Sequence, residues 1–339
     1  LVSLIAVAGS ISDNGDAHVD VSAGTLRFKA GFGVGFISDS GINPIDIVVD
    51  IVAGASGVAG IYLENTSDLS VGSSVPVTVD RVDSAGATPV ADQLTDAGLD
   101  GLETTEGNGV IVVATINGEL SVDQPVVASL GGNIRLESAS TGINDKDILV
   151  NAAVTSGSGH VSLLANHNLK LAAAGDITTG GGTVDLEAAN GSVEMADGAV
   201  VSSNAGAIRV HAEVNIKVAS LNAGSGALSV SAITGSITDN GETNIDLAGG
   251  RLRLVAGIGV GATANHLDTA VAKVAAEAGA GGIFLTDDDA IEIGKVAAVD
   301  YTRVQSSGSV LNFSDAVLDG LLTQAGDAAI VAETLNGSL

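Results

Sequence analysis

Apolar and polar residues alternate over short stretches along most of this chain, and a glycine often precedes such a stretch. The recurring phrase is a glycine, any residue, an apolar residue, any residue and a second apolar residue. It begins at Gly24, Gly132, Gly159, Gly182, Gly206, Gly226 and Gly250. The last six glycines follow one another at intervals of 20 to 27 residues, which is typical of one coil of a solenoid. Alternation with a period of two predicts strands with one buried face.

Each interval contains further short strands. After Gly159 the apolar pairs Val161/Leu163 and Leu169/Leu171 are followed by Ile177. Glycine, Asn and Asp lie between them, and we expect these residues to supply positive φ and side-chain turns at the corners. Stacked coils would pair each strand in parallel with its equivalents, and the crossover rule predicts a right-handed parallel β-helix. The fold class is therefore all-β, a β-solenoid of roughly 11–14 rungs and about 55–65 Å in length.

A larger repeat includes the small one. Residues 8–35 align without gaps to 234–261 at an offset of 226, and 15 of the 28 positions are identical. The match continues at offsets of 222 and then 219. The chain therefore reads as block A (1–120), block B (121–226) and a second block A (227–339), all in one continuous solenoid.

Block A is less regular and suggests short helices. Val271, Val274, Ala275 and Ala278 have the spacing of an amphipathic helix, and Ser314-Asp315 resembles a helix cap. We expect short helical excursions near 46–56, 268–278 and 314–322, packed on the side of the solenoid.

Composition narrows the function classes. The 339 residues are 45% hydrophobic but only 2% aromatic, with no tryptophan and no cysteine, so a narrow aliphatic core is expected without disulfides or thiolate metal sites. A formal charge of −27 argues against nucleic acid and anionic membranes as partners. This negative charge is compatible with a solvated surface or with binding of divalent cations. No run reaches the ~20 apolar residues of a membrane helix. Leu1 follows no basic leader, so we expect a segment of a longer chain without its own signal peptide.

The rungs of block B resemble the filamentous-haemagglutinin-type β-helix of large bacterial exoproteins. The block A stretches 235–241, 254–261 and 282–289 are similar to stretches in giant repeat-containing surface proteins of environmental bacteria. The resemblance implies an extracellular or cell-surface rod used in adhesion, biofilm or an extracellular filament. Its partners would be adjacent repeats of the same long chain, like chains in a filament or sheath, and surface glycans. The family's secretion domain would lie N-terminal to this segment.

Candidate metal ligands are few. The run Asp287, Asp288 and Asp289 offers carboxylates for Ca²⁺, which prefers oxygen ligands. In the first block A the corresponding residues are Asn65, Thr66 and Ser67, so a solvated turn is the competing interpretation. Asp13-Asn14-Gly15 and Asp239-Asn240-Gly241 occupy equivalent positions of the two copies. We interpret them as Asx-Gly corners, with a metal role as the other hypothesis.

Other chemistry is weakly supported. Gly31–Gly35 and Gly257–Gly261 lack the spacing and the βαβ context of a nucleotide loop. The histidines are scattered, at His18, His160, His167, His211 and His266. The phenol side chains are Tyr62 and Tyr301, and we interpret Asp185, Arg209 and Arg253 as cross-rung charge pairing on the outer face. We therefore expect a structural protein, neither an enzyme nor a cofactor binder apart from Ca²⁺. A calcium-dependent binding module and a carbohydrate-active β-helix enzyme are the two other function classes considered.

Overall fold

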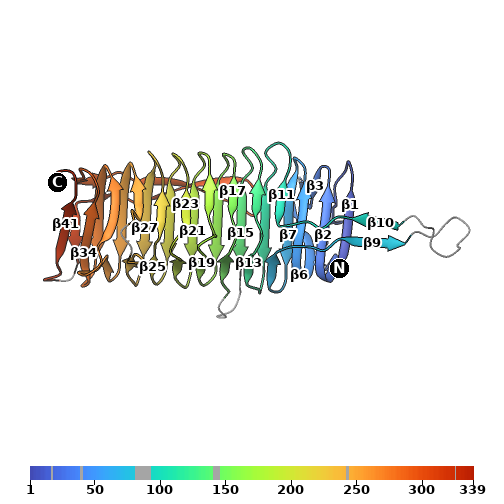
Figure 1. Cartoon of the computed structure of the whole chain (residues 1–339), viewed down its shortest axis with the longest axis horizontal. Coiled ribbons are helices and arrows are strands. Elements are labelled where there is room, and N and C mark those ends of the chain that lie inside the picture. The colour runs from blue at the N-terminus through green and yellow to red at the C-terminus, as the bar shows by residue number, and fades with distance from the viewer. Residues whose placement is uncertain (17, 39–40, 81–92, 140–145, 242–243, 325) are drawn as a thin grey trace, which may run out of the picture.

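The computed structural model describes residues 1–339 except 17, 39–40, 81–92, 140–145, 242–243 and 325. The chain is an all-β parallel β-solenoid of about 11 turns, and its described residues contain no helix. Figure 1 shows the turns stacked along one axis, with the N-terminal and C-terminal residues at opposite ends. The predicted fold class is confirmed.

One sheet of 33 strands contains almost all of the solenoid, and its strands form three parallel ladders. Ladder one contains β1 (Val2–Ala6), β2 (Val21–Ala30), β6 (Ile45–Ser56), β11 (Leu102–Thr104), β14 (Val126–Ala128), β17 (Val154–Ser156), β20 (Ile177–Thr179), β23 (Val200–Ser202), β26 (Ser220–Asn222), β29 (Leu247–Gly249) and β32 (Leu267–Val271). Ladder two contains β3 (Gly33–Val34), β7 (Gly60–Asn65), β12 (Ile111–Thr115), β15 (Ile134–Ser138), β18 (Val161–Ala165), β21 (Val184–Ala188), β24 (Ile208–Ala212), β27 (Ala227–Ala232), β30 (Arg251–Ala256), β33 (Lys273–Ala278), β35 (Glu292–Ile293) and β40 (Leu321–Thr323). Ladder three contains β8 (Leu69–Val71), β13 (Leu120–Val122), β16 (Ile148–Val150), β19 (Leu169–Leu171), β22 (Val193–Met195), β25 (Ile216–Lys217), β28 (Ile237–Thr238), β31 (Gly259–Val260), β34 (Gly282–Asp287) and β41 (Ile330–Thr334).

The remaining strands form four antiparallel pairs outside the ladders. They are β4 (Phe36–Ser38) with β5 (Gly41–Asn43), β9 (Val77–Asp80) with β10 (Gln93–Asp96), β36 (Lys295–Val296) with β39 (Leu318–Asp319), and β37 (Val299–Val304) with β38 (Val310–Asp315). Two of these pairs, β9–β10 and β37–β38, occupy equivalent places in the two copies of block A.

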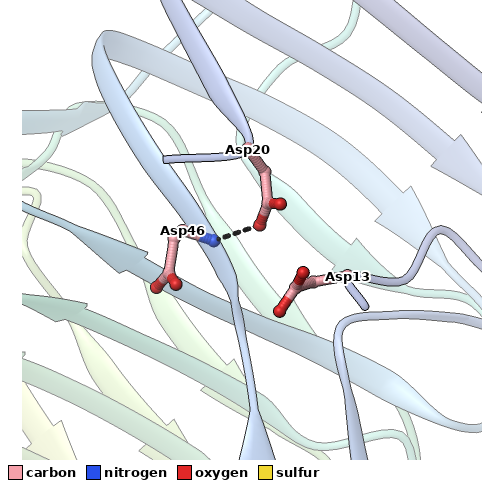
Figure 2. Close-up of side chains that lie close together, drawn as sticks. All are labelled: Asp13, Asp20 and Asp46. Atoms are coloured by element: carbon pink, nitrogen blue, oxygen red, sulfur yellow. Dashed lines mark hydrogen bonds between the residues drawn. The ribbon is translucent and has the colours of Figure 1, made fainter. Parts of the chain in front are cut away.

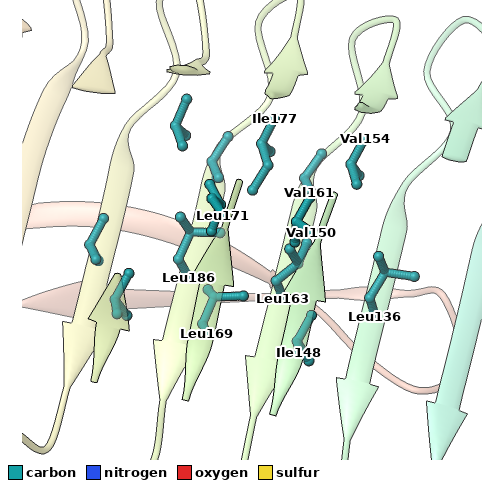
Figure 3. Packing of buried hydrophobic residues seen from close by; sticks show 14 of the residues in the cluster. Leu136, Ile148, Val150, Val154, Val161, Leu163, Leu169, Leu171, Ile177 and Leu186 are labelled. Atoms are coloured by element: carbon teal, nitrogen blue, oxygen red, sulfur yellow. The ribbon is translucent and has the colours of Figure 1, made fainter. Parts of the chain in front are cut away.

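The core is a set of aliphatic columns that run along the solenoid. The register places Val161 beside Val184 and Leu163 beside Leu186, and these four side chains are fully buried. Figure 3 shows such side chains stacked from turn to turn inside the ladders. Each buried Val or Leu contributes roughly 1.5–3 kcal/mol relative to an exposed one, so the stack is stabilised turn by turn.

The repeated glycines are explained by close packing between turns. A Cβ added at Gly182 would lie 1.9 Å from the carbonyl oxygen of Gly159, and one at Gly206 would lie 1.9 Å from that of Gly182. Neither glycine has a positive φ, so the expectation of left-handed corners is wrong for this column. It holds at Gly15 and Gly241, whose φ values are 90° and 85°.

The three helical excursions expected from the sequence are wrong. Residues 46–56 belong to β6, and 268–278 belong to β32 and β33. Residues 314–322 are divided among β38, β39 and β40. These segments are strands because they pair with parallel strands of the neighbouring turns: Val52 pairs with Leu26 and Val274 with Leu252. Tertiary pairing and burial override the helical spacing of these apolar residues.

Candidate functional site

The β37–β38 hairpin covers the outer face of ladder two. The Thr183 hydroxyl donates to the Thr302 carbonyl oxygen (3.0 Å) and accepts from the Thr302 N–H (3.1 Å). The Val304 N–H donates to Ser162 Oγ (2.9 Å), and the Arg135 guanidinium donates to the Val304 carbonyl oxygen (2.6 Å). The hairpin is therefore attached to successive turns of the solenoid, more than 100 residues away in the sequence.

Charged side chains join the hairpin to the rungs. Arg303 of β37 donates to Asp185 Oδ2 at 2.6 Å and also contacts Glu187. Arg209 donates to Asp185 Oδ1 at 2.8 Å and stacks over the ring of Tyr301, 4.7 Å from its centroid. Burial opposes ionisation of Glu187, but Arg303 and Arg209 lower the pKa of this carboxyl below its ordinary value. Arg209 also lies 3.6 Å from Asp315 of β38, so two arginines pair with three carboxylates at this contact.

The predicted pairing of Asp185 with Arg209 is confirmed, but its surroundings differ from the expectation. Asp185 is fully buried because the hairpin covers it. Arg253 does not join this pair; its Nε donates to the Ala316 carbonyl oxygen instead. The sequence signal missed here is the alternation in 299–304 and 310–315 around Gly308, which is typical of a β-hairpin.

A shallow groove beside the β37–β38 hairpin brings acidic and arginine side chains together, as a catalytic site would require. Its lining includes Arg135, Glu137, Glu187, Arg303 and Phe313. Arg135 contacts Glu137 at 2.6 Å and Arg303 contacts Glu187. Both carboxylates are thus bound by arginines, an arrangement that suits attachment of the hairpin better than proton transfer.

Two groups of three aspartates converge at equivalent corners of the two block A copies. Asp13, Asp20 and Asp46 form the first triad, shown in Figure 2, where the side chains come from three separate chain segments. The second triad consists of Asp239, Asp246 and Asp268. In each triad the three carboxylate ligand atoms lie within 4.8 Å of one another. The offsets of 226, 226 and 222 between the triads are those of the block repeat.

The two triads share one hydrogen-bond framework. The Asp46 N–H donates to Asp20 Oδ2 at 2.9 Å, and the Asp268 N–H donates to Asp246 Oδ2 at 2.8 Å. Each corner also has a glycine of positive φ that donates to the first aspartate: Gly15 to Asp13 (3.0 Å) and Gly241 to Asp239 (3.1 Å). The predicted Asx-Gly corners are therefore present, and each one positions a carboxylate of a triad.

The first triad concentrates negative charge. Burial, followed by Glu64 and the other aspartates, raises the pKa of Asp46 to about 6, and burial also raises the pKa of Asp20. Among the residues that the structure describes, no Lys, Arg or His forms an ion pair with Asp13, Asp20 or Asp46. Three carboxylates in this arrangement can serve as ligands for a hard cation.

The aspartate run proposed from the sequence is arranged differently. Asp287 is buried in β34, where its carboxylate accepts hydrogen bonds from Thr269 Oγ1 (2.7 Å) and the Val271 N–H (3.1 Å). Asn65 replaces it in the first copy and accepts from the equivalent Val49 N–H at 3.0 Å. Asp288 contacts Asn336, and Asp289 is exposed. The described structure does not bring the three carboxylates together, and Asp287 has the role of a buried hydrogen-bond acceptor.

The histidines occupy separate environments. His160 Nδ1 lies 3.0 Å from Thr183 Oγ1, and His167 Nδ1 lies 3.0 Å from Asp147. His266 contacts Thr286, and His18 contacts Asp16 on the exposed surface. Within the described residues, no histidine belongs to a group of three metal ligands. The described part of the chain also contains no helix with the length and hydropathy needed to cross a membrane.

In comparisons with known proteins, no family model, curated protein or solved structure matches the chain.

Proposed function

We propose that this chain is a structural segment of a long secreted or cell-surface bacterial protein, in which the solenoid forms an extended rod for adhesion or for extracellular filament architecture. The observation that supports this role best is the 33-stranded sheet, whose ladders pass through all three sequence blocks. A solenoid of this kind adds length with every repeat and presents a continuous surface. The proposed role is structural rather than catalytic.

The hairpins β9–β10 and β37–β38 support the proposal that adjacent repeats of the long chain bind one another. At the base of β37–β38, Arg253 donates to the Ala316 carbonyl oxygen (2.8 Å) and to Ser229 (3.4 Å). The first copy repeats both contacts: Arg27 donates to the Ala97 carbonyl oxygen (2.7 Å) and to Ser3 (3.0 Å). Both hairpins therefore leave the solenoid in the same way.

The hairpins differ in what they cover. β37–β38 lies on the rungs of block B, whereas β9–β10 extends past β1 at the N-terminal end of the stack (Figure 1). Val79 and Leu94 of β9 and β10 are 49% and 46% exposed. We propose that β9–β10 docks on rungs of block B type in an adjacent repeat of the same long chain, as β37–β38 does here.

Hydrogen exchange would test this docking. A second copy of residues 121–226 (block B) is placed before Leu1. The first block A then follows a block B directly, as the second block A does in the chain. We expect the amides of 77–80 and 93–96 to become protected. The matched control carries Asp185→Lys and Glu187→Lys in the added copy only, and we expect it to remove the protection. Unchanged exchange in the extended chain would contradict the docking.

The extracellular role needs a separate test on the source cells. Antibodies against the folded chain should label intact cells, with label on surface filaments in electron micrographs. Labelling that requires permeabilised cells would contradict the proposed location, although it would leave the solenoid and its docking intact.

A further inference from the structure

We propose that each aspartate triad binds one Ca²⁺ ion, so that the chain has two calcium sites at equivalent corners of its two block A copies. This inference concerns the corners of the solenoid and is independent of where the protein works. It differs from the calcium hypothesis for Asp287–Asp289, because it concerns other residues.

The recurrence of each triad is the first observation. Its first two aspartates are seven residues apart and the third lies 22 to 26 residues further on, and all three are retained in both copies. Only 15 of the 28 residues in the aligned stretch around the first two aspartates are identical. The same backbone N–H groups orient the carboxylates in each copy. The repeat thus preserves a geometry as well as a composition.

A buried oxygen without a partner is the second observation. Asp239 is 5% exposed. Its Oδ1 accepts from Gly241 and from the Asn265 side chain. Its Oδ2 is buried and has no hydrogen-bond partner. An unsatisfied buried carboxylate oxygen is costly, and Oδ2 is the oxygen that this residue has available for a cation.

The chemistry and the spacing suit Ca²⁺. Calcium takes oxygen ligands at about 2.3–2.6 Å, so two oxygens bound to one ion lie at most about 5 Å apart. The separations within each triad, all below 4.8 Å, fit this limit. A side-chain amide also lies at each corner: Asn265 contacts Asp239, and Asn43 donates to the Asp13 carbonyl oxygen. Rotation of either amide by 180° would present its oxygen as a neutral ligand.

Isothermal titration of the full 339-residue chain with CaCl₂, after treatment with a chelator, would test the proposal. We expect two ions per chain. Asp20→Asn and Asp246→Asn each remove one charged ligand and should each abolish one site or weaken it by about tenfold or more. The double variant should lose both sites. Because each single variant retains one triad, binding at the intact site reports that the chain is folded.

Asp289→Asn is the matched control, since it removes an exposed acidic charge outside both triads. It should leave the two-ion stoichiometry unchanged, and a parallel titration with MgCl₂ should show weaker binding. The proposal would be overturned by no binding at millimolar Ca²⁺. It would also be overturned by a stoichiometry that Asp289→Asn reduces while Asp20→Asn and Asp246→Asn do not.

Discussion

Gly182→Ala probes the contact between turns of the solenoid directly. The added Cβ would lie 1.9 Å from the Gly159 carbonyl oxygen, whereas real Cβ contacts stay above about 3.0 Å. The two turns must therefore separate locally by at least about 1.1 Å. The Val161 N–H donates to the Thr183 carbonyl oxygen across the same gap at 3.0 Å, and a separation of that size would break this hydrogen bond.

Gly181→Ala is the matched control at the adjacent position. A Cβ at Gly181 meets no atom within 4 Å, and Gly181 does not have a positive φ. Overpacking costs about 1–3 kcal/mol and one lost backbone hydrogen bond about 0.5–1.5 kcal/mol. We therefore expect Gly182→Ala to destabilise the surrounding turns by about 2–4 kcal/mol. Gly181→Ala should change stability by less than about 1 kcal/mol, in the stabilising direction.

Native-state hydrogen exchange is the appropriate assay, because long repeat arrays do not always unfold in a single transition. Faster exchange should be confined to β18, β21 and the turns beside them. Equal protection in the two variants would refute the explanation of the glycine column by close approach of the backbones.

Three further predictions concern the core, the hairpin and acid stability. Leu163→Ala should lower the free energy of unfolding in a urea titration by about 2–5 kcal/mol, and Leu164→Ala, which is half-buried, by much less. Arg303→Met should speed hydrogen exchange in 299–315 and leave the ladders protected, since Asp185 and Glu187 of β21 keep Arg209 as a partner; slower or unchanged exchange there would contradict the proposed attachment. Burial opposes ionisation of Asp147, but Lys170, the Asn168 N–H and His167 lower its pKa to about 2. Its ionised form therefore stabilises the fold above about pH 4, and this contribution is lost as the pH falls towards 2. Asp147→Asn should cost about 2 kcal/mol at pH 5 and little at pH 2, and an equal cost at both values would contradict this account.

Much of the fold could be predicted because the solenoid is built from local patterns. Alternation at Val161/Leu163 and Val184/Leu186 identifies inward-facing positions within a single strand. The interval between glycines then fixes the length of a turn. These signals need no knowledge of distant contacts, and they suffice for the fold class.

The errors arose where distant contacts decide the structure. The spacing of Val271, Val274 and Ala278 fits a helix, but β30 on one side pairs with β33 as a strand. Asp185 looked like a surface charge, but a hairpin from more than 100 residues away buries it. Neither contact can be derived from local periodicity.

The candidate metal site shows the same limit. Consecutive aspartates at 287–289 drew attention because they are adjacent in the sequence, although only Asp287 belongs to β34, and Asp288 and Asp289 lie beyond the end of that strand. Asp239, Asp246 and Asp268 converge because a corner and the next turn bring them together. The signal available in the sequence was the retention of each aspartate at the repeat offset.

The most direct test of the rod is structural extension of the chain. Leu339 aligns with Leu120 at the offset of 219, so a second copy of residues 121–339 can be appended after it in phase with the repeat. Cryo-electron microscopy should show one uninterrupted stack of unchanged width. The rod should be longer by about eight turns, or about 38 Å at the spacing of parallel strands. Two separate bodies joined by a linker, or a particle that widens without lengthening, would contradict the account.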